Sequence, residues 1–413
     1  MNHIEIPAIK ISQPFGDFFS CKFKAKDLLE LTFSDPLRFI DDSGKMAGNQ
    51  RILDDRRIEE IGKYIQTVDV AFPNSIIIAA NYGINGALCE DELRRWRLVP
   101  VGNNDLYNLI IPTNEKLASV IDGQHRLNGF LNVPNHLKDI ELLCSVYLDL
   151  PNPYQAQIFA TINFNQKKVD KSLAYEQFGF NLDSEPSHSW SPEKLAVFFT
   201  RKLNQDDKEK SIFYNHIILA PQDDNLIFQK KPKQLSWAIS TSTIVDCIIS
   251  LFSTNNKRDK YLLHKFQVDE RKRTVLVKDS SPFRQIYIAN NDIVIYTAIS
   301  NFFKAAYDTL ISKSKEGSYI KKTVGVQALF DTLRIISAKT LEKSKDLSEA
   351  FYSSYLVKVQ QVDFKDNFYQ ASGVGRGRIK NTILYANNLI EDSDLKDSDL
   401  TEIKRILKGS PQQ

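Results

Sequence analysis

The stretch SVIDGQHRL, residues 119–127, joins a short apolar strand directly to a helix. Asp122-Gly123 marks the turn, because glycine lets the backbone reverse sharply and lets a ligand approach closely. The helix that follows exposes unpaired backbone N–H groups and the positive end of its dipole. His125 and Arg126 add two donor side chains at the same point, and an arginine can fork onto phosphate oxygens. The order of strand, turn and helix therefore predicts an anion site suited to phosphate.

The same residues allow a second interpretation. Asp122 and Gly123 can form only a capped turn, with His125 and Arg126 on a solvated helix face. In the functional interpretation, Asp122 either caps the helix or helps to hold a metal ion bound to the phosphate, which makes it the candidate catalytic residue. The residues alone leave both interpretations open.

Elements of alternating type surround this motif. Residues 51–67 carry isoleucines near helical spacing and predict an amphipathic helix, whereas residues 75–80 are short and β-branched and predict a buried strand. Further expected elements are a hairpin over 98–111, strands over 117–121 and 140–148, and helices over 124–131 and 153–163. We therefore expect a mixed sheet flanked by helices.

From about residue 191 onward, long helix-like segments dominate. Their lengths and spacing are typical of an α-helical bundle, and they span residues 191–204, 235–253, 291–312, 321–343, 345–360 and 378–391. Between them, residues 274–277 and 285–289 suggest a small hairpin. We expect an α+β protein, with a mixed-sheet domain over residues 1–185 and a mainly helical domain over residues 186–413.

The composition is that of an ordinary globular chain, with 42% hydrophobic and 25% charged residues. A formal net charge of +3 permits nucleic-acid binding without arguing for it. The four cysteines form no CxxC pair, so we do not expect a structural zinc site. The sequence has neither the pattern of a signal peptide nor a bilayer-spanning apolar run, and we expect a cytoplasmic protein with no membrane partner.

The pentapeptide DGQHR is the defining motif of the DGQHR-domain family, which this sequence resembles. That family includes the DndB-like proteins of bacterial DNA phosphorothioation and related proteins of DNA-modification and antiphage defence systems. Residues 49–51, 72–77 and 159–163 also resemble segments of these proteins. The wider resemblance is to the ParB/sulfiredoxin-like superfamily, and it implies a ParB/sulfiredoxin-like fold for the first domain.

The resemblance also implies which residues hold nucleotide phosphates: Gly123, Gln124, His125, Arg126, Gln50, Arg51 and Asn163. The implied cofactor is ATP or another nucleotide, with Mg²⁺ as an accompanying ion. Gln124 stands where sulfiredoxin has its cysteine, so sulfinic-acid reduction through that thiol is excluded. Asn163 ends a helix-like segment, where its amide can serve equally well as a cap.

Four basic clusters are candidates for phosphate or DNA contacts. Arg56 and Arg57 are implied by the resemblance, although they can simply form ion pairs on a helix face. Arg376 and Arg378 lie in the glycine-rich stretch 373–378 before a helix-like segment, where a flexible loop either binds a DNA backbone or serves as a hinge. The other two clusters, RRWR at 94–97 and RKR at 271–273, suit nucleic acid or an ordinary solvated loop.

Three hypotheses about function follow. The first is a DNA-associated regulatory or accessory protein, acting in transcription regulation or DNA modification with other proteins of its operon; a weak ATPase activity and a homo-oligomer are compatible with it. The second is a ParB-fold enzyme, whether NTPase, phosphotransferase or nuclease, which needs a metal and a base close to His125 and Arg126. Asp122 is the one carboxylate that the sequence places there. The third is a scaffold whose DGQHR motif binds DNA phosphate directly.

Overall fold

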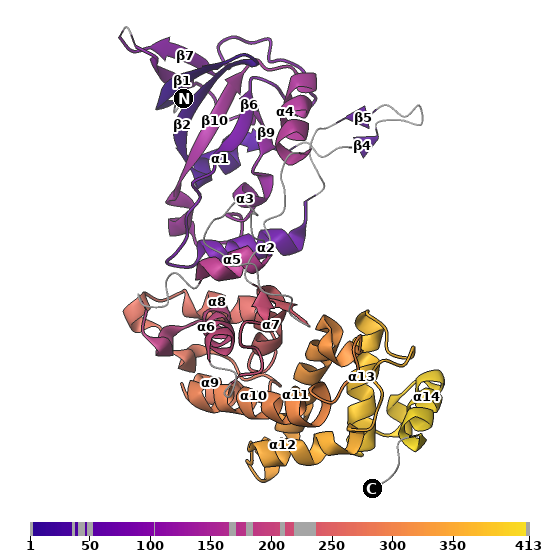
Figure 1. Cartoon of the computed structure of the whole chain (residues 1–413). Coiled ribbons are helices and arrows are strands. Elements are labelled where there is room, and N and C mark those ends of the chain that lie inside the picture. Colours follow the sequence, from indigo (N-terminus) through magenta and orange to yellow (C-terminus); the bar gives the residue numbers. More distant parts are fainter. Residues whose placement is uncertain are drawn as a thin grey trace. The chain divides into compact units, whose positions relative to one another are not determined.

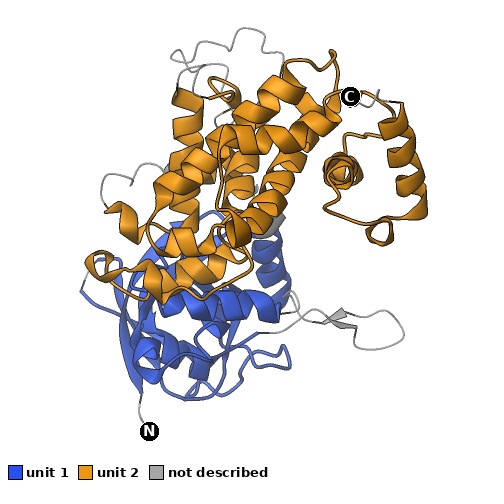
Figure 2. Cartoon of the chain, turned by 90° about the horizontal axis from the view of Figure 1, so that it is seen from below, with its two compact units in different colours: residues 1–168 blue, residues 169–413 orange. Residues whose placement is uncertain are grey.

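The computed structural model describes residues 3–34, 38–39, 46–47, 53–102, 104–164, 171–178, 185–206, 211–218 and 237–409. It divides into two compact units, residues 1–168 (unit 1) and residues 169–413 (unit 2), which Figure 2 colours separately. Helix α5 (Lys171–Phe178) packs against other helices of unit 2. The domain limits expected from the sequence, 1–185 and 186–413, stay a prediction.

A mixed sheet of eight strands forms the centre of unit 1 in the described residues (Figure 1). In spatial order its strands are β3 (Thr32–Phe33), β9 (Ala118–Asp122), β6 (Ile76–Ala80), β10 (Glu141–Leu148), β2 (Gly16–Lys24), β1 (Ile4–Gln13), β8 (Leu106–Ile111) and β7 (Arg97–Pro100). The pairs β10–β6 and β3–β9 are parallel, and the other pairs are antiparallel. The predicted mixed sheet and the predicted hairpin, now β7–β8, are confirmed, whereas the sequence analysis missed β1 and β2. A separate two-stranded pair joins β4 (Arg38–Phe39) to β5 (Met46–Ala47).

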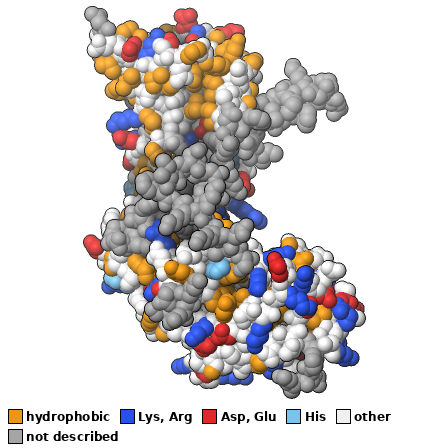
Figure 3. Space-filling view, in the orientation of Figure 1, with side chains coloured by type: hydrophobic (Ala, Val, Ile, Leu, Met, Phe, Trp, Pro, Cys, Tyr) orange, Lys and Arg blue, Asp and Glu red, His pale blue; other side chains and the backbone are white. Residues whose placement is uncertain are grey.

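Side-chain alternation distinguishes strands covered on one face from strands covered on both. In β10, Leu142 and Cys144 are buried while Leu143 between them is exposed, which is the pattern of a strand with one covered face. Strand β6 is buried along nearly its whole length, as expected of a strand covered on both faces. On the open face, Ile9 of β1 lies opposite Leu106 of β8, and both are exposed (53% and 44%); Figure 3 shows such hydrophobic side chains at the surface of unit 1.

Four helices of unit 1 pack on or beside the sheet: α1 (Ala25–Leu31), α2 (Asp55–Ile65), α3 (Gln124–Asn128) and α4 (Asn152–Phe164). Helix α3 packs against both α1 and α2, and α4 packs against β9. The Ser119 hydroxyl of β9 donates to Oε1 of the fully buried Gln155 of α4 over 2.5 Å. This polar contact fixes α4 beside the strand that leads into the DGQHR turn.

Unit 2 is mainly helical, as predicted. After α5 its α-helices are α6 (Pro192–Gln205), α7 (Thr241–Ile249), α8 (Asn256–Leu263), α9 (Arg284–Ile288), α10 (Asp292–Ala306), α11 (Thr323–Lys343), α12 (Glu349–Leu356), α13 (Gly373–Ala386) and α14 (Asp397–Lys408). One short parallel pair, β11 (Ile217–Ile218) with β12 (Ile239–Ser240), lies among them. Aromatic rings fill the core, with the centroids of Phe303 and Phe330 4.5 Å apart. Among the helices of the described ranges, none combines the length and the apolar character that a membrane span requires.

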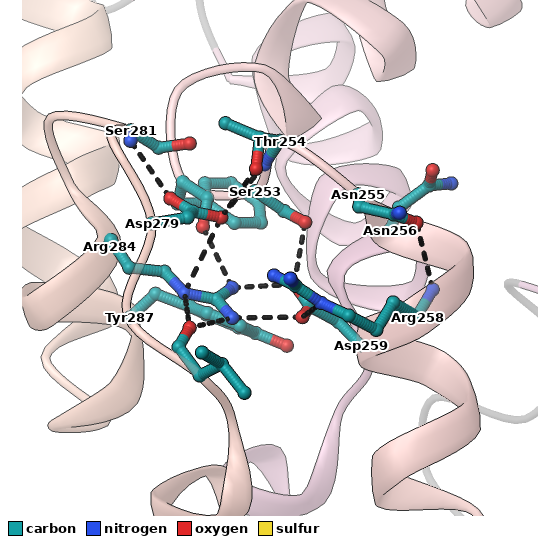
Figure 4. A network of polar contacts seen from close by, with 12 residues as sticks. Ser253, Thr254, Asn255, Asn256, Arg258, Asp259, Asp279, Ser281, Arg284 and Tyr287 are labelled. Atoms are coloured by element: carbon teal, nitrogen blue, oxygen red, sulfur yellow. Dashed lines mark hydrogen bonds and ion pairs between the residues drawn. The ribbon is translucent and has the colours of Figure 1, made fainter.

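Buried arginines hold the middle of unit 2 together (Figure 4). The Arg284 guanidinium pairs at two points with the fully buried carboxylate of Asp259, over 2.5 and 2.8 Å. Ser253 also donates to that carboxylate, over 2.6 Å. A buried ion pair is tolerated when such further hydrogen bonds satisfy its remaining atoms. Arg273, which is also fully buried, pairs with Asp292 in the same two-point way.

These anchors explain why the hairpin predicted over 274–277 and 285–289 is wrong. The first segment falls in the 3₁₀ turn η5 (Arg273–Val275), and the second falls in α9. Arg273 and Arg284 begin these two elements, and both side chains are directed into the core. With both guanidinium groups buried in the core, the two segments form helical turns and do not pair as strands.

Glu193, in the first turn of α6, is a buried acid of unit 2 with 6% of its surface exposed. Its Oε1 accepts a hydrogen bond from Asn256 over 2.8 Å, and its Oε2 has no hydrogen-bond partner in the part of the chain that the structure describes. Burial raises the pKa of this carboxyl above its usual range, although Lys260 and nearby hydrogen bonds act in the opposite direction. Glu193 therefore favours the protonated form more strongly in the folded chain than in the unfolded chain.

This shift predicts the effect of Glu193→Gln on stability. A raised folded-state pKa contributes stability below the unfolded pKa, and that contribution is lost as pH rises through the folded pKa. The glutamine variant has no carboxyl to ionise and does not lose this stability. Its melting temperature should therefore rise relative to that of the parent as pH rises from about 5 to about 8. Thermal melting across this range measures the difference. The exposed Glu342→Gln serves as the matched control, and parallel pH profiles for parent and Glu193→Gln would contradict the assignment.

Candidate functional site

The DGQHR segment forms the predicted strand-to-helix turn. Strand β9 ends at Asp122, Gly123 adopts a left-handed conformation with φ of 98°, and α3 begins at Gln124. A methyl group on Gly123 would lie 2.5 Å from Cδ1 of Ile76 in β6. Glycine is therefore needed here both for its backbone conformation and for the close approach of a neighbouring strand.

The Arg126 guanidinium is directed to acceptors within unit 1. Its Nη1 donates to the carbonyl of Asn74, and its Nη2 donates to the carbonyl of Ser75 over 2.9 Å and to Oδ2 of Asp122 over 3.0 Å. The side chain is only 20% exposed. The fork expected to hold phosphate is thus occupied by a carboxylate and two carbonyls, which join the end of β9 to the start of β6. Asp122, the candidate catalytic residue, is the ion-pair partner in this arrangement.

His125 connects the same turn to helix α2. Its Nε2 accepts a hydrogen bond from the backbone N–H of Asp54 over 3.1 Å. Asp54 in turn caps α2, with its side chain accepting from the N–H groups of Arg56 and Arg57. His125 therefore positions the first turn of α2, where two exposed arginine side chains begin.

The remaining predicted phosphate ligands differ in what the structure says of them. Gln124 is 4% exposed and belongs to the interior of unit 1. Asn163 falls in the last turn of α4, and its side chain is outside the described part of the chain. Gln50 and Arg51 also lie outside the described residues; they precede Asp54 by four and three positions in the sequence. In the described residues, no three His, Cys, Asp or Glu side chains gather as a metal ion would require.

Hydrogen bonds bring together the DGQHR turn, the start of α2 and the segment 72–77, which resembles the DGQHR family. His125 contacts Asp54, which follows residues 49–51, and Arg126 contacts Asn74 and Ser75 within residues 72–77. The sequence analysis missed Asp54 as a partner, although an aspartate before a helix is an ordinary N-cap signal. Backbone carbonyls carry no such signal, so the Arg126 contacts were not predictable from side-chain types.

The expectation of a flexible loop over residues 373–378 is wrong, because these residues form the first turns of α13. Ser372 caps the helix by accepting from the N–H of Gly375, and a side chain on Gly375 would overlap the backbone of Gln370. Close packing against the backbone, rather than a need for flexibility, explains why residue 375 is a glycine.

Arg376 and Arg378, the DNA candidates, form ion pairs within unit 2. Arg376 pairs at two points with Asp331, over 2.7 and 2.8 Å. Arg378 pairs with Asp399 over 2.8 and 3.0 Å and lies over the ring of Phe368. Their DNA contact stays a prediction, and it would compete with these ion pairs.

The other two basic clusters are also used internally. Trp96 of the RRWR cluster is 1% exposed, and Arg95 pairs with Asp149 over 2.6 Å. Arg271 and Arg273 are buried, with 1% and 0% of their surfaces exposed. The interpretation of these two arginines as a solvated or DNA-facing loop is therefore wrong, since both guanidinium groups belong to the core of unit 2.

Residues 6–202 match the model of the DndB family, which is described as DNA-sulfur modification-associated. Residues 6–202 are DndB-like. The match covers a little under half of the chain and includes the whole DGQHR turn, α2 and the predicted ligands from Gln50 to Asn163. No curated protein and no solved structure matches the chain. The ParB/sulfiredoxin-like assignment of the fold therefore stays a prediction.

The close packing at Gly123 predicts a marked loss of stability in Gly123→Ala. Alanine in a left-handed conformation costs about 1–2 kcal/mol, and overpacking against Ile76 adds about 1–3 kcal/mol. Gly102→Ala is the matched control, because Gly102 is also left-handed, with φ of 69°, and has open space around it. Urea denaturation of both variants should give a larger loss for Gly123→Ala. Equal losses would contradict the packing role of Gly123.

Arg126→Ala should weaken the junction of β6 and β9. The change leaves Asp122 and two carbonyl groups without their donor, which costs about 1–3 kcal/mol. Hydrogen exchange at the amides of these two strands should therefore become faster than in the parent. Arg97→Ala, at an exposed position of β7, should change exchange little. Unchanged protection in Arg126→Ala would show that its hydrogen bonds do not hold the strands together.

Proposed function

We propose that this chain is a DNA-associated regulatory or accessory protein of a bacterial DNA-sulfur modification system. The DndB-like segment over residues 6–202 supports the assignment to such a system. We further propose that unit 1 binds a nucleotide, with ATP as the first candidate, beside the DGQHR turn. The observation that carries this second part is the convergence of the turn, the start of α2 and the start of β6 through His125 and Arg126.

In this proposal, His125 and Arg126 are positioning residues. Their ring and guanidinium atoms are engaged with Asp54 and with residues 74–75, so they shape the site rather than extend into it. Arg56 and Arg57 are exposed in the first turn of α2, and Gln50 and Arg51 come just before it in the sequence. Guanidinium groups at that point can fork onto phosphate oxygens. We therefore assign the phosphate contacts to the start of α2.

Binding is better supported than catalysis. A general base must be able to accept a proton from the reacting group, and Asp122 instead accepts a hydrogen bond from Arg126 over 3.0 Å. We therefore propose Asp122 as a positioning residue as well. Nucleotide binding then regulates the association of the protein with DNA and with other proteins of its operon.

Isothermal titration of the full chain with ATP, with CTP and with duplex DNA tests the proposal. The double variant Arg56→Gln, Arg57→Gln should lose at least about a hundredfold in nucleotide affinity, because charge-assisted contacts contribute about 1.5–3 kcal/mol each. The backbone N–H groups that Asp54 caps are unchanged in this variant.

The matched control is Lys22→Gln with Lys116→Gln, which removes the same charge from exposed positions elsewhere in unit 1. The control should bind nucleotide like the parent. Equal affinities of the two double variants would place the phosphate site elsewhere. A parent chain that binds neither nucleotide would reject the nucleotide part of the proposal.

A further inference from the structure

Five lysines lie near the start of α11, the long helix of unit 2 that Figure 1 labels. This lysine surface consists of Lys313, Lys315, Lys321, Lys322 and Lys365. Contacts between the two segments involved show that the residues lie together. Lys315 pairs with Asp363 over 2.6 Å, the Lys365 side chain lies beside Gly317, and the N–H of Tyr319 donates to the carbonyl of Phe364 over 3.0 Å.

The charges of this surface are unbalanced. Glu316 and Asp363 are the carboxylates in the same two segments, residues 313–322 and 363–365. The Lys315 ammonium holds the pKa of Asp363 below its usual range, so this carboxylate is ionised at neutral pH and paired with one lysine. Lys313, Lys322 and Lys365 remain exposed. The surface therefore presents a net positive charge to solvent.

The backbone beneath these lysines is firmly packed. Ser318 and Ile320 are 1% and 0% exposed, and a side chain on Gly325 of α11 would overlap the carbonyls of Tyr319 and Ile320. The 3₁₀ turn η7 (Tyr319–Lys321) is thus seated directly on the first turn of α11. The lysine side chains therefore extend from a backbone that is already packed in place.

The chemistry of the surface favours a phosphodiester backbone over other anionic partners. Lysine ammonium groups act as point charges for phosphate and read no base sequence. A membrane-binding surface combines lysines with exposed apolar side chains. The described part of the chain has no exposed large hydrophobic side chain between residues 308 and 356.

We propose that the lysine surface is a contact site for the sugar–phosphate backbone of duplex DNA. The inference rests on the DNA association proposed above and assigns it to residues that the sequence analysis did not single out. In this proposal DNA contact does not require Arg376 and Arg378, because their guanidinium groups are paired with Asp331 and Asp399. The exposed lysines can bind phosphate without breaking an ion pair of that kind.

Fluorescence anisotropy with a labelled random-sequence duplex, at increasing salt concentration, tests this inference on the full chain. The triple variant Lys313→Gln, Lys322→Gln, Lys365→Gln should bind at least about tenfold more weakly than the parent at low salt. The slope of log affinity against log salt should become shallower by about 0.9 for each phosphate that the variant no longer neutralises. Thermal melting verifies that the variant is folded.

The control triple Lys278→Gln, Lys343→Gln, Lys345→Gln removes the same charge from exposed positions elsewhere in unit 2. It should retain the affinity and the salt slope of the parent. If the two triple variants bind DNA equally well, the lysine surface is not the contact site, while the proposed DNA association stands. If the parent does not bind duplex DNA at low salt, the DNA association itself is overturned. Binding of the parent to vesicles of anionic lipid but not to DNA would replace DNA with a membrane as the partner.

Discussion

The guanidinium group of Arg126 is the contact on which the arrangement of unit 1 depends. It donates to Asp122, four positions earlier in the sequence, and to the backbone carbonyls of Asn74 and Ser75, which are more than fifty positions earlier. The antiparallel pair β6–β9 is irregular between Ile77 and Ile78, close to where Arg126 reaches it. Because a guanidinium offers five donors in one plane, a single side chain can satisfy acceptors from two strands at once. His125 extends the same junction to α2.

The sequence predicted the elements whose signals are local. The Asp122-Gly123 turn, β6 and the β7–β8 hairpin follow from glycine, β-branched runs and turn residues within a few positions. The sequence did not reveal that the Arg126 guanidinium donates to backbone carbonyls. These acceptors are distant in the chain and belong to the backbone, so no side-chain type marks them. Strands β1 and β2 were overlooked, although Phe19, Cys21 and Phe23 of β2 alternate with more exposed residues in the period of a strand that is covered on one face.

Several arginines of unit 2 lie in its core, whereas the lysines near α11 lie at its surface. Arg273 and Arg284 are buried, and Lys313 and Lys322 are exposed. The guanidinium is weakly hydrated and planar, so it can leave water when carboxylates and carbonyls satisfy its donors; the ammonium is strongly hydrated and leaves water only with a partner of its own, as Lys194 does beside Glu185. A count of basic residues cannot make this distinction. That is why runs rich in arginine were misread as surface, while the lysines near α11 escaped notice.

The position of β10 between β2 and β6 has a consequence for how this chain acquires its shape during synthesis. The hairpin β1–β2 is synthesised well before its neighbour in the sheet, which begins only at Glu141. Until then the backbone N–H and C=O groups along one edge of β2 have no partner strand. The nascent chain carries this open edge through more than a hundred residues of translation. An unpaired strand edge is a template for wrong pairing, so a chaperone that covers it would raise the yield of folded protein.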